Sequence, residues 1–171
     1  MKRIGLQAFA AVVLLCAASG TAVAQGAVAA RASGGMSWII PESQFGFEIV
    51  VVVTFNGRKY ENGDVLGRID YHLTAFGEHF HDSIRMTCLE VYDGGTRVKY
   101  GGVVEVSNNT DPGTQWVWFQ GIDNGEGAGA PPDQSTIGGV GTEEENEAFC
   151  ASPAPPTFIF DVNGNIQVVE G

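Results

Sequence analysis

Short runs of β-branched and aromatic residues follow one another from Gln44 onward, at a spacing of roughly ten residues. The turn-forming sequences between them include Asn56-Gly57, Asn62-Gly63, Asp93-Gly94-Gly95 and Asn163-Gly164, whose residues tolerate the positive φ of tight hairpins. The runs cover residues 44–55, 58–61, 65–74, 79–91, 97–107, 115–123, 157–162 and 165–169. This pattern predicts one all-β domain over residues 44–171, an antiparallel β-sandwich or barrel of about seven to eight strands.

The alternation of one hairpin is clear enough to predict its register. A turn at Phe76-Gly77 places Ala75 opposite Glu78 and gathers the apolar side chains on one face. The apolar face then carries Val65, Ile69, Tyr71, Leu73, Phe80, Ile84, Met86 and Cys88, with Asp82 among them and Leu66 as the main exception. The other face carries Arg68, Asp70, His72, Thr74, His79, His81, Ser83, Arg85 and Thr87. This register points Cys88 into the core.

The N-terminal residues have the pattern of an export signal. Lys2 and Arg3 precede an apolar stretch over residues 4–18, and Ala22-Val23-Ala24 forms a small-x-small cleavage site. We therefore predict a signal peptide over residues 1–24 and a secreted or periplasmic protein. The stretch is too short for a membrane span, and nothing after it approaches the roughly 18 apolar residues that a span requires. Residues 25–43 show no sustained periodicity, which predicts a flexible lead-in.

Cysteine usage fits this compartment. Cys16 lies in the predicted signal peptide, where the large residues before it disfavour lipoprotein processing. Cys88 and Cys150 remain, and an even pair in an oxidising compartment predicts one disulfide. Two free buried thiols are the alternative.

The chain is strongly acidic. Nine Lys and Arg against twenty Asp and Glu give a net charge of −11, and removal of Lys2 and Arg3 makes it −13. Such a charge argues against nucleic acids and anionic membrane surfaces as partners, because both require a basic face. Thr142 to Phe149 forms the best helical segment, with capping-box spacing between Thr142 and Glu145. It is so short that a solvated acidic loop is the favoured interpretation.

All three histidines fall on the polar face of the predicted hairpin. His72 lies opposite His81, and His79 is diagonal to His72. Three imidazoles at such spacing can ligate a transition metal such as zinc. An exposed sheet face lacks the outer shell that tunes a metal site, so a plain polar surface is the favoured interpretation.

A second candidate metal site is the glycine-rich loop that begins at Asp123. The side chains of Asp123, Asn124, Glu126 and Asp133 offer the hard oxygen ligands that calcium prefers. No cofactor is predicted apart from this candidate calcium ion. The spacing does not match an EF-hand loop, and Asp-Asn-Gly is also an ordinary turn sequence.

Trp116 and Trp118 share one side of the run over residues 115–123. Paired indoles on an open face can stack on sugar rings. A central strand covered on both sides explains the same apolar run and is favoured.

The stretch from Val117 to Gly127, followed by Pro131-Pro132-Asp133 and Gly164-Asn165-Ile166, resembles a group of small exported bacterial β-domains of uncharacterised function. The shared features are an Asp-Asn-Gly-Glu loop and a C-terminal Gly-Asn-Ile strand. Gly67 to Tyr71 and His81 to Ile84 also resemble that group, so the resemblance covers about residues 44–169. It implies one β-domain and carries no activity, substrate or catalytic residue.

The sequence has none of the catalytic motifs that would support an enzyme. The sequence has no Gly-x-Ser-x-Gly nucleophile turn and no glycine-rich phosphate loop with its lysine. We therefore expect a non-enzymatic binding or structural module, with a metal-dependent or carbohydrate-active protein as the alternative. The sequence does not identify the binding partner; a glycan and a cell-surface component are the candidates.

Overall fold

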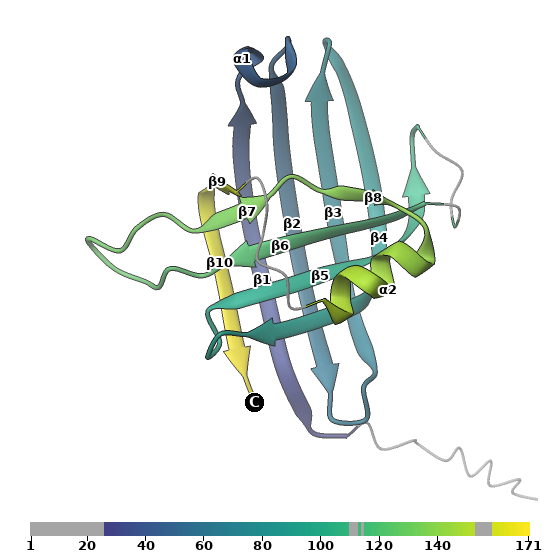
Figure 1. The fold of residues 1–171 in the computed structure, drawn as a ribbon, viewed down its shortest axis with the longest axis vertical. Helices are drawn as coiled ribbons and strands as arrows, with labels where there is room; N and C mark the ends of the chain where they lie inside the picture. Colours follow the sequence, from purple (N-terminus) through teal and green to yellow (C-terminus); the bar gives the residue numbers. More distant parts are fainter. Residues whose placement is uncertain (1–25, 110–112, 114, 153–158) are drawn as a thin grey trace, which may run out of the picture.

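The computed structural model describes residues 26–109, 113, 115–152 and 159–171, which form an all-β fold with two helices (Figure 1). Within these residues the ten strands are β1 Val28–Ile40, β2 Ile49–Tyr60, β3 Val65–Ala75, β4 Glu78–Tyr92, β5 Arg97–Ser107, β6 Trp116–Ile122, β7 Gln134–Thr136, β8 Gly139–Gly141, β9 Ile159–Asp161 and β10 Asn163–Glu170. The helices are α1 Glu42–Phe45 and α2 Glu143–Ala151. The predicted all-β class is confirmed, with more strands than expected. The predicted signal peptide lies outside the described residues.

The sheet is antiparallel throughout and nearly closes on itself. Its order is β10-β1-β2-β3-β4-β5-β6-β7-β9, with β8 paired to β6. β9 and β10 stand at opposite ends of this order, yet only Val162 separates them in the chain. The sheet therefore curls until its two ends meet, which gives a barrel-like shape.

Large side chains fill the inside of this barrel. Tyr100 and Phe119 are fully buried. The Tyr100 ring stacks on Phe55 with centroids 4.1 Å apart and on Phe119 with centroids 5.4 Å apart. Each such burial stabilises the fold by about 1.5–3 kcal/mol. The interior is therefore a packed core, and a functional site is expected on the outside of the barrel.

The predicted β3–β4 hairpin has the register that the alternation indicated. Phe76 and Gly77 form the turn with φ of 57° and 77°, and Ala75 pairs with Glu78. Both φ values are positive, as a two-residue hairpin turn of type I′ requires. Ile69 and Ile84 pair with each other and are fully buried, so the predicted apolar face does point inward.

The prediction that Cys88 points into the core is wrong, because β4 contains a β-bulge. Met86 pairs with Gly102 and Cys88 with Gly101, so Thr87 is an extra residue in the strand. The extra residue reverses the alternation beyond it. Met86 and Leu89 therefore belong to the core, whereas Cys88 faces outward and bonds to Cys150 of α2, with 6.3 Å between the Cα atoms.

Residues 25–43 were expected to be a flexible lead-in, but the structure places β1 there, between β2 and β10. Every second residue of β1 points inward. The alternation escapes notice because several of these inward residues are small, namely Ala30, Ala32 and Gly34. A Cβ at Gly34 would lie 2.6 Å from Cε1 of Phe55, so the small residue leaves room for the Phe55 ring in the core. The domain therefore includes β1 and does not begin at residue 44.

Asn56-Gly57 was expected to be a turn, but it lies inside β2, which continues to Tyr60. A Cβ at Gly57 would collide with the Met86 sulfur. This glycine serves close packing, not a positive φ. The turn comes later, at Asn62-Gly63, where Gly63 has φ of 90°.

Residues 143–151 form helix α2, so the acidic-loop interpretation is wrong. The Thr142 hydroxyl accepts from the Glu145 amide, and the Glu145 carboxylate accepts from the Thr142 amide, which completes the capping box. The helix lies across the outer face of the barrel, over β4, β5 and β6 (Figure 1).

Candidate ligand-binding groove under helix α2

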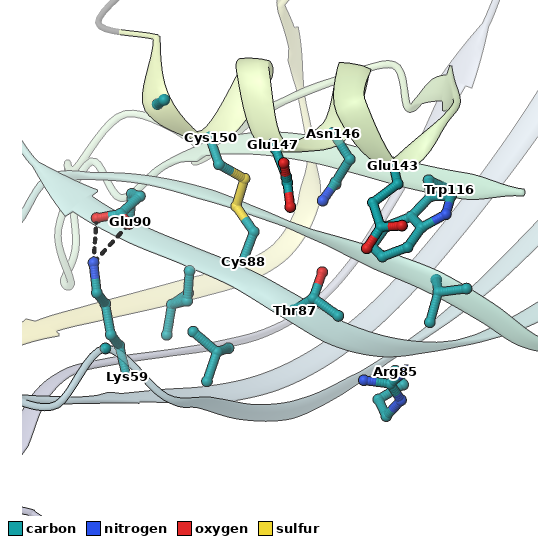
Figure 2. Close-up of a pocket in the computed structure, with 15 residues that line it drawn as sticks. Lys59, Arg85, Thr87, Cys88, Glu90, Trp116, Glu143, Asn146, Glu147 and Cys150 are labelled. Carbon is teal, nitrogen blue, oxygen red and sulfur yellow. Dashed lines mark hydrogen bonds and ion pairs between the residues drawn. A yellow bond between two sulfur atoms is a disulfide. The ribbon is translucent and has the colours of Figure 1, made fainter. Parts of the chain in front are cut away.

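A groove of about 500 Å³ lies between α2 and the outer face of the sheet (Figure 2). The Cys88–Cys150 disulfide forms part of its wall. Its polar and aromatic lining comes from four elements: Lys59 of β2, Arg85, Thr87 and Glu90 of β4, Trp116 of β6, and Glu143, Asn146 and Glu147 of α2, with the apolar Val103 of β5 beside them.

Three contacts hold α2 at its place on the sheet. The disulfide fixes its last turn to β4. The Phe149 ring stacks on Trp118 with centroids 5.9 Å apart. The Lys99 ammonium donates to the backbone oxygens of Phe149 and Ser152, at the end where a helix favours positive charge. Burial lowers the pKa of Lys99.

Two buried oxygen atoms lack a hydrogen-bond partner where α2 faces β4. Asn146 is 1 % exposed, and its Oδ1 has no partner among the described residues. The same holds for the Thr87 hydroxyl. Asn146 Oδ1 lies against Gly101 of β5, where an added Cβ would collide with it. Figure 2 shows the Asn146 nitrogen pointing from α2 toward the sheet and the Thr87 hydroxyl pointing toward α2. Buried polar atoms in folded proteins almost always have a partner, so these two require an explanation.

The charged side chains of the groove are unequally paired. Lys59 bonds to Glu90 at 2.6 Å, and Arg85 bonds to Glu105 at 2.8 Å. In the part of the chain that the structure describes, Glu143 and Glu147 make no ion pair. The groove therefore has two cations that are already neutralised and two carboxylates that are not.

The two candidate tryptophans have different surroundings. Trp118 lies beneath α2, where a Cβ at Gly139 would collide with its indole ring, so both helix and β8 pack on it. Trp116 is half-buried and lines the groove beside Glu143 (Figure 2). The predicted stacking platform is thus reduced to one indole at the groove wall.

The histidines lie together as the register predicted, on the outer face of β3 and β4. His72 pairs with His81, and their rings stack with centroids 4.3 Å apart. The His79 ring shares a hydrogen bond of 2.8 Å with the Thr74 hydroxyl. Among the described residues, no group of three or more His, Cys, Asp or Glu side chains is arranged to hold a metal ion. The zinc hypothesis stays a prediction.

The candidate calcium loop joins the two ends of the sheet. Asp133 is 5 % exposed and accepts from the backbone amides of Asn124 at 2.8 Å and Ile166 at 2.6 Å. Asp123 accepts from the amides of Gly125 and Val168. We call the residues from 123 to 133, with the β10 amides they bind, the carboxylate seam.

The other two candidate calcium ligands also bind protein groups in the seam. Asn124 donates to the Pro132 carbonyl oxygen, and Glu126 accepts from the side-chain amides of Asn165 and Gln167. These hydrogen bonds lower the pKa of Glu126. A calcium ion would compete with donors that the protein already supplies, and its binding stays a prediction for a calcium titration to test.

Sequence reasoning singled out Trp116 but missed Thr87, Glu143, Asn146 and Glu147. The segment interpreted as an acidic loop did indicate that three of these residues lie together. If that segment is a helix, Glu143 and Glu147 share one face, with Asn146 beside them. Thr87 was predicted on the polar face of the hairpin, but nothing in the sequence indicated that α2 lies over this position.

Comparison with protein families, curated proteins and solved structures finds no match. Among the described residues, no helix is long and apolar enough to cross a membrane. The function is therefore inferred from the groove itself.

Proposed function

We propose that this chain is an exported, non-enzymatic binding module that holds a small polar ligand in the groove under α2. The observation that carries the proposal is the cavity of about 500 Å³ itself, whose lining brings together Thr87, Asn146 and the side chains of Glu143 and Glu147. A cavity of this volume with a few convergent polar groups is the usual form of a small-molecule site. The disulfide supports export, since such bonds persist in oxidising compartments.

The composition of the polar lining favours binding over catalysis. The polar lining consists of Lys59, Arg85, Thr87, Glu90, Glu143, Asn146 and Glu147 and includes no imidazole, because the described histidines lie elsewhere on β3 and β4. Without an imidazole, the Thr87 hydroxyl lacks the most common general base. A saccharide is the second candidate ligand class, since the indole of Trp116 offers a flat apolar surface at the groove wall.

Thermal unfolding in the presence of small polar compounds tests the proposal. The panel consists of glucose, N-acetylglucosamine, glucosamine, spermidine and lysine, each at 10 mM as a chosen upper concentration, roughly 100 times a Kd of about 0.1 mM. A ligand at that ratio stabilises the native state by about 2.7 kcal/mol, which raises Tm by several degrees.

A variant that blocks the groove tests whether the ligand binds there, and the same substitution elsewhere on the sheet is its matched control. Thr87→Phe places a ring in the groove, and Thr54→Phe places the same ring on the exposed face of β2. We expect the first variant to lose the rise in Tm and the second to keep it. A panel that leaves Tm unchanged, or a rise that survives Thr87→Phe, would contradict a binding groove and favour a structural role.

A further inference from the structure

We infer that one end of the barrel is a docking surface for a polypeptide partner whose contact face carries apolar side chains flanked by lysine or arginine. The surface is separate from the groove under α2. It consists of Phe45, Phe47 and Phe76, which we call the phenylalanine tip. Phe45 and Phe47 belong to the connection from β1 to β2, and Phe76 belongs to the β3–β4 turn at the same end of the sheet (Figure 1).

The phenylalanine tip is an exposed apolar surface at which the two connections meet. The ring centroids of Phe47 and Phe76 are 3.9 Å apart. Phe76 is 74 % exposed and Phe45 is 50 % exposed, and Ile39 near the end of β1 is 59 % exposed. Single exposed apolar residues are ordinary, whereas apolar side chains gathered on one surface mark an interaction site.

The conformation of Phe76 is unfavourable for the fold. Its φ of 57° lies in the left-handed region. A two-residue turn with two positive φ values favours Asn-Gly or Asp-Gly, and a bulky side chain is an outlier there. Because most of the ring stays exposed, little burial offsets this unfavourable backbone conformation. A residue held in such a conformation without a gain in packing points to a function at this position.

The charges around the phenylalanine tip indicate what covers it. Glu42, Glu48 and Glu78 are close to the three phenylalanines in the chain, and all three are exposed. Residues 32–57 and 69–84, which include both connections, contain no lysine or arginine. The tip is therefore an apolar centre with an acidic rim, and a partner with an apolar centre and a basic rim is complementary to it.

The same charges disfavour two other occupants of an exposed apolar surface. A second copy of the chain would bring one acidic rim against another, and like charges across an interface oppose association. An anionic lipid surface would repel both the rim and a chain of net charge −11. A basic polypeptide gains attraction at the rim as well as burial of the phenylalanine rings.

Synthetic peptides of equal length separate the apolar contribution from the charged one. One has a core of leucine and phenylalanine between lysines, one has the same core between glutamates, and one has a serine core between lysines. Fluorescence anisotropy with the full chain at physiological salt measures each Kd. We expect the lysine-flanked apolar peptide to bind roughly ten-fold more tightly than either of the others.

Matched variants place this peptide at the phenylalanine tip. Phe76→Asn should weaken its binding roughly ten-fold, and Glu78→Gln should weaken it roughly two- to three-fold. Leu66→Asn is the control, because Leu66 is 50 % exposed but lies at the opposite end of β3. Asparagine suits the turn, so Phe76→Asn should have the same Tm as the unaltered protein or a higher one.

The stability of Phe76→Asn also tests the inference without any peptide. A lower Tm in this variant would overturn the inference, because the ring would then have a structural role. Failure of the lysine-flanked apolar peptide to bind, or equal binding of the glutamate-flanked peptide, would overturn it as well.

The other occupants are separate outcomes. A dimer in sedimentation velocity that Phe76→Asn dissociates would assign the tip to a second copy, and binding to phosphatidylcholine vesicles that Phe76→Asn abolishes would assign it to lipid. Either result would overturn a basic polypeptide partner. Thr87→Phe, which blocks the groove, should leave peptide binding unchanged, so this inference and the proposed function can fail independently. Loss of peptide binding in Thr87→Phe would place the peptide in the groove and overturn the inference.

Discussion

The carboxylate seam and the α2 groove use the same residue types in opposite ways. In the seam, Asp123 and Asp133 each accept backbone hydrogen bonds that include one from β10. In the groove, Glu143 and Glu147 have no ion-pair partner among the described residues, and Asn146 Oδ1 is buried without a donor. The seam is a satisfied polar network that stabilises the fold, and the groove is an unsatisfied one.

The difference teaches where to look for function in an acidic chain. Acidic residues are too frequent here to be informative by type or spacing. The two regions differ in whether hydrogen-bond donors of the protein reach their side-chain oxygens. β10 is at the end of the sheet order, and its outer amides have no strand partner, so they bind the loop carboxylates. No described backbone donor reaches the corresponding oxygens beneath α2.

Removal of the disulfide should have the largest effect. Cys88→Ser with Cys150→Ser opens a cross-link between residues separated by 62 positions, which costs about 4 kcal/mol of unfolding free energy on the chain-entropy estimate. Urea unfolding measures the loss. Hydrogen exchange should show that α2 loses protection while the amides of Ile166 and Val168 in the seam keep theirs. Equal loss in both regions would show that groove and seam are not independent.

The next largest effect is expected in the seam. Asp133→Asn keeps the shape of the side chain but leaves one of the two backbone amides, of Asn124 or Ile166, facing an NH₂ group. A buried donor without an acceptor costs about 1–3 kcal/mol, so we expect a loss of about 2 kcal/mol in urea unfolding. A change below about 0.5 kcal/mol would show that the seam does not depend on this carboxylate.

The same acid-to-amide change in the groove should have a much smaller effect on stability. Glu147→Gln removes a charge that has no ion pair among the described residues and repels Glu143. We expect a change within about 0.5 kcal/mol, toward higher stability. The urea midpoints of Glu147→Gln and Asp133→Asn, measured side by side, test the comparison directly. A loss as large as that of Asp133→Asn would show that Glu147 has a structural role.

The smallest expected effect is a pH dependence at the exposed end of the seam. Hydrogen bonds from Asn165 and then Gln167 lower the pKa of Glu126. Because the folded-state pKa lies below the unfolded value, this group adds stability above the unfolded pKa, and the contribution is lost as the pH falls through the folded pKa. Asn165→Ala should raise the pKa of Glu126 in an NMR titration, and Gln167→Ala should raise it less. An unchanged pKa in Asn165→Ala would contradict the contact.

Elements governed by local alternation were predictable from sequence. The β3–β4 hairpin is correct from the pair Arg68 and Arg85 to the turn at Phe76-Gly77, because apolar side chains alternate there, and it fails only beyond the bulge at Thr87. β1 was missed because small residues occupy its inward positions to make room for Phe55. Glycine in Asn56-Gly57 has the signature of a turn but serves packing against Met86.

The candidate site was harder to predict, because it depends on contacts between distant parts of the chain. The Cys88–Cys150 pair followed from counting cysteines, but the side of the sheet on which it lies depends on the bulge at Thr87. The groove arises only when α2 is placed on β4, and no local pattern encodes that placement. The sequence also does not reveal which side-chain oxygens receive a hydrogen bond. Only the tertiary structure shows that those of Asp133 do and that Asn146 Oδ1 does not.

The position of β1 between β2 and β10 also has a kinetic consequence. β1 to β6 each pair with a chain neighbour, so these hairpins can form one after another from local contacts. β10 pairs with β1 across most of the chain, as in the pair Ala30 and Glu170. Contacts between such distant residues form slowly, because a long loop must close first. Closure of the barrel is therefore expected as a late, slow folding step, during which both edges of the sheet remain open to wrong partners.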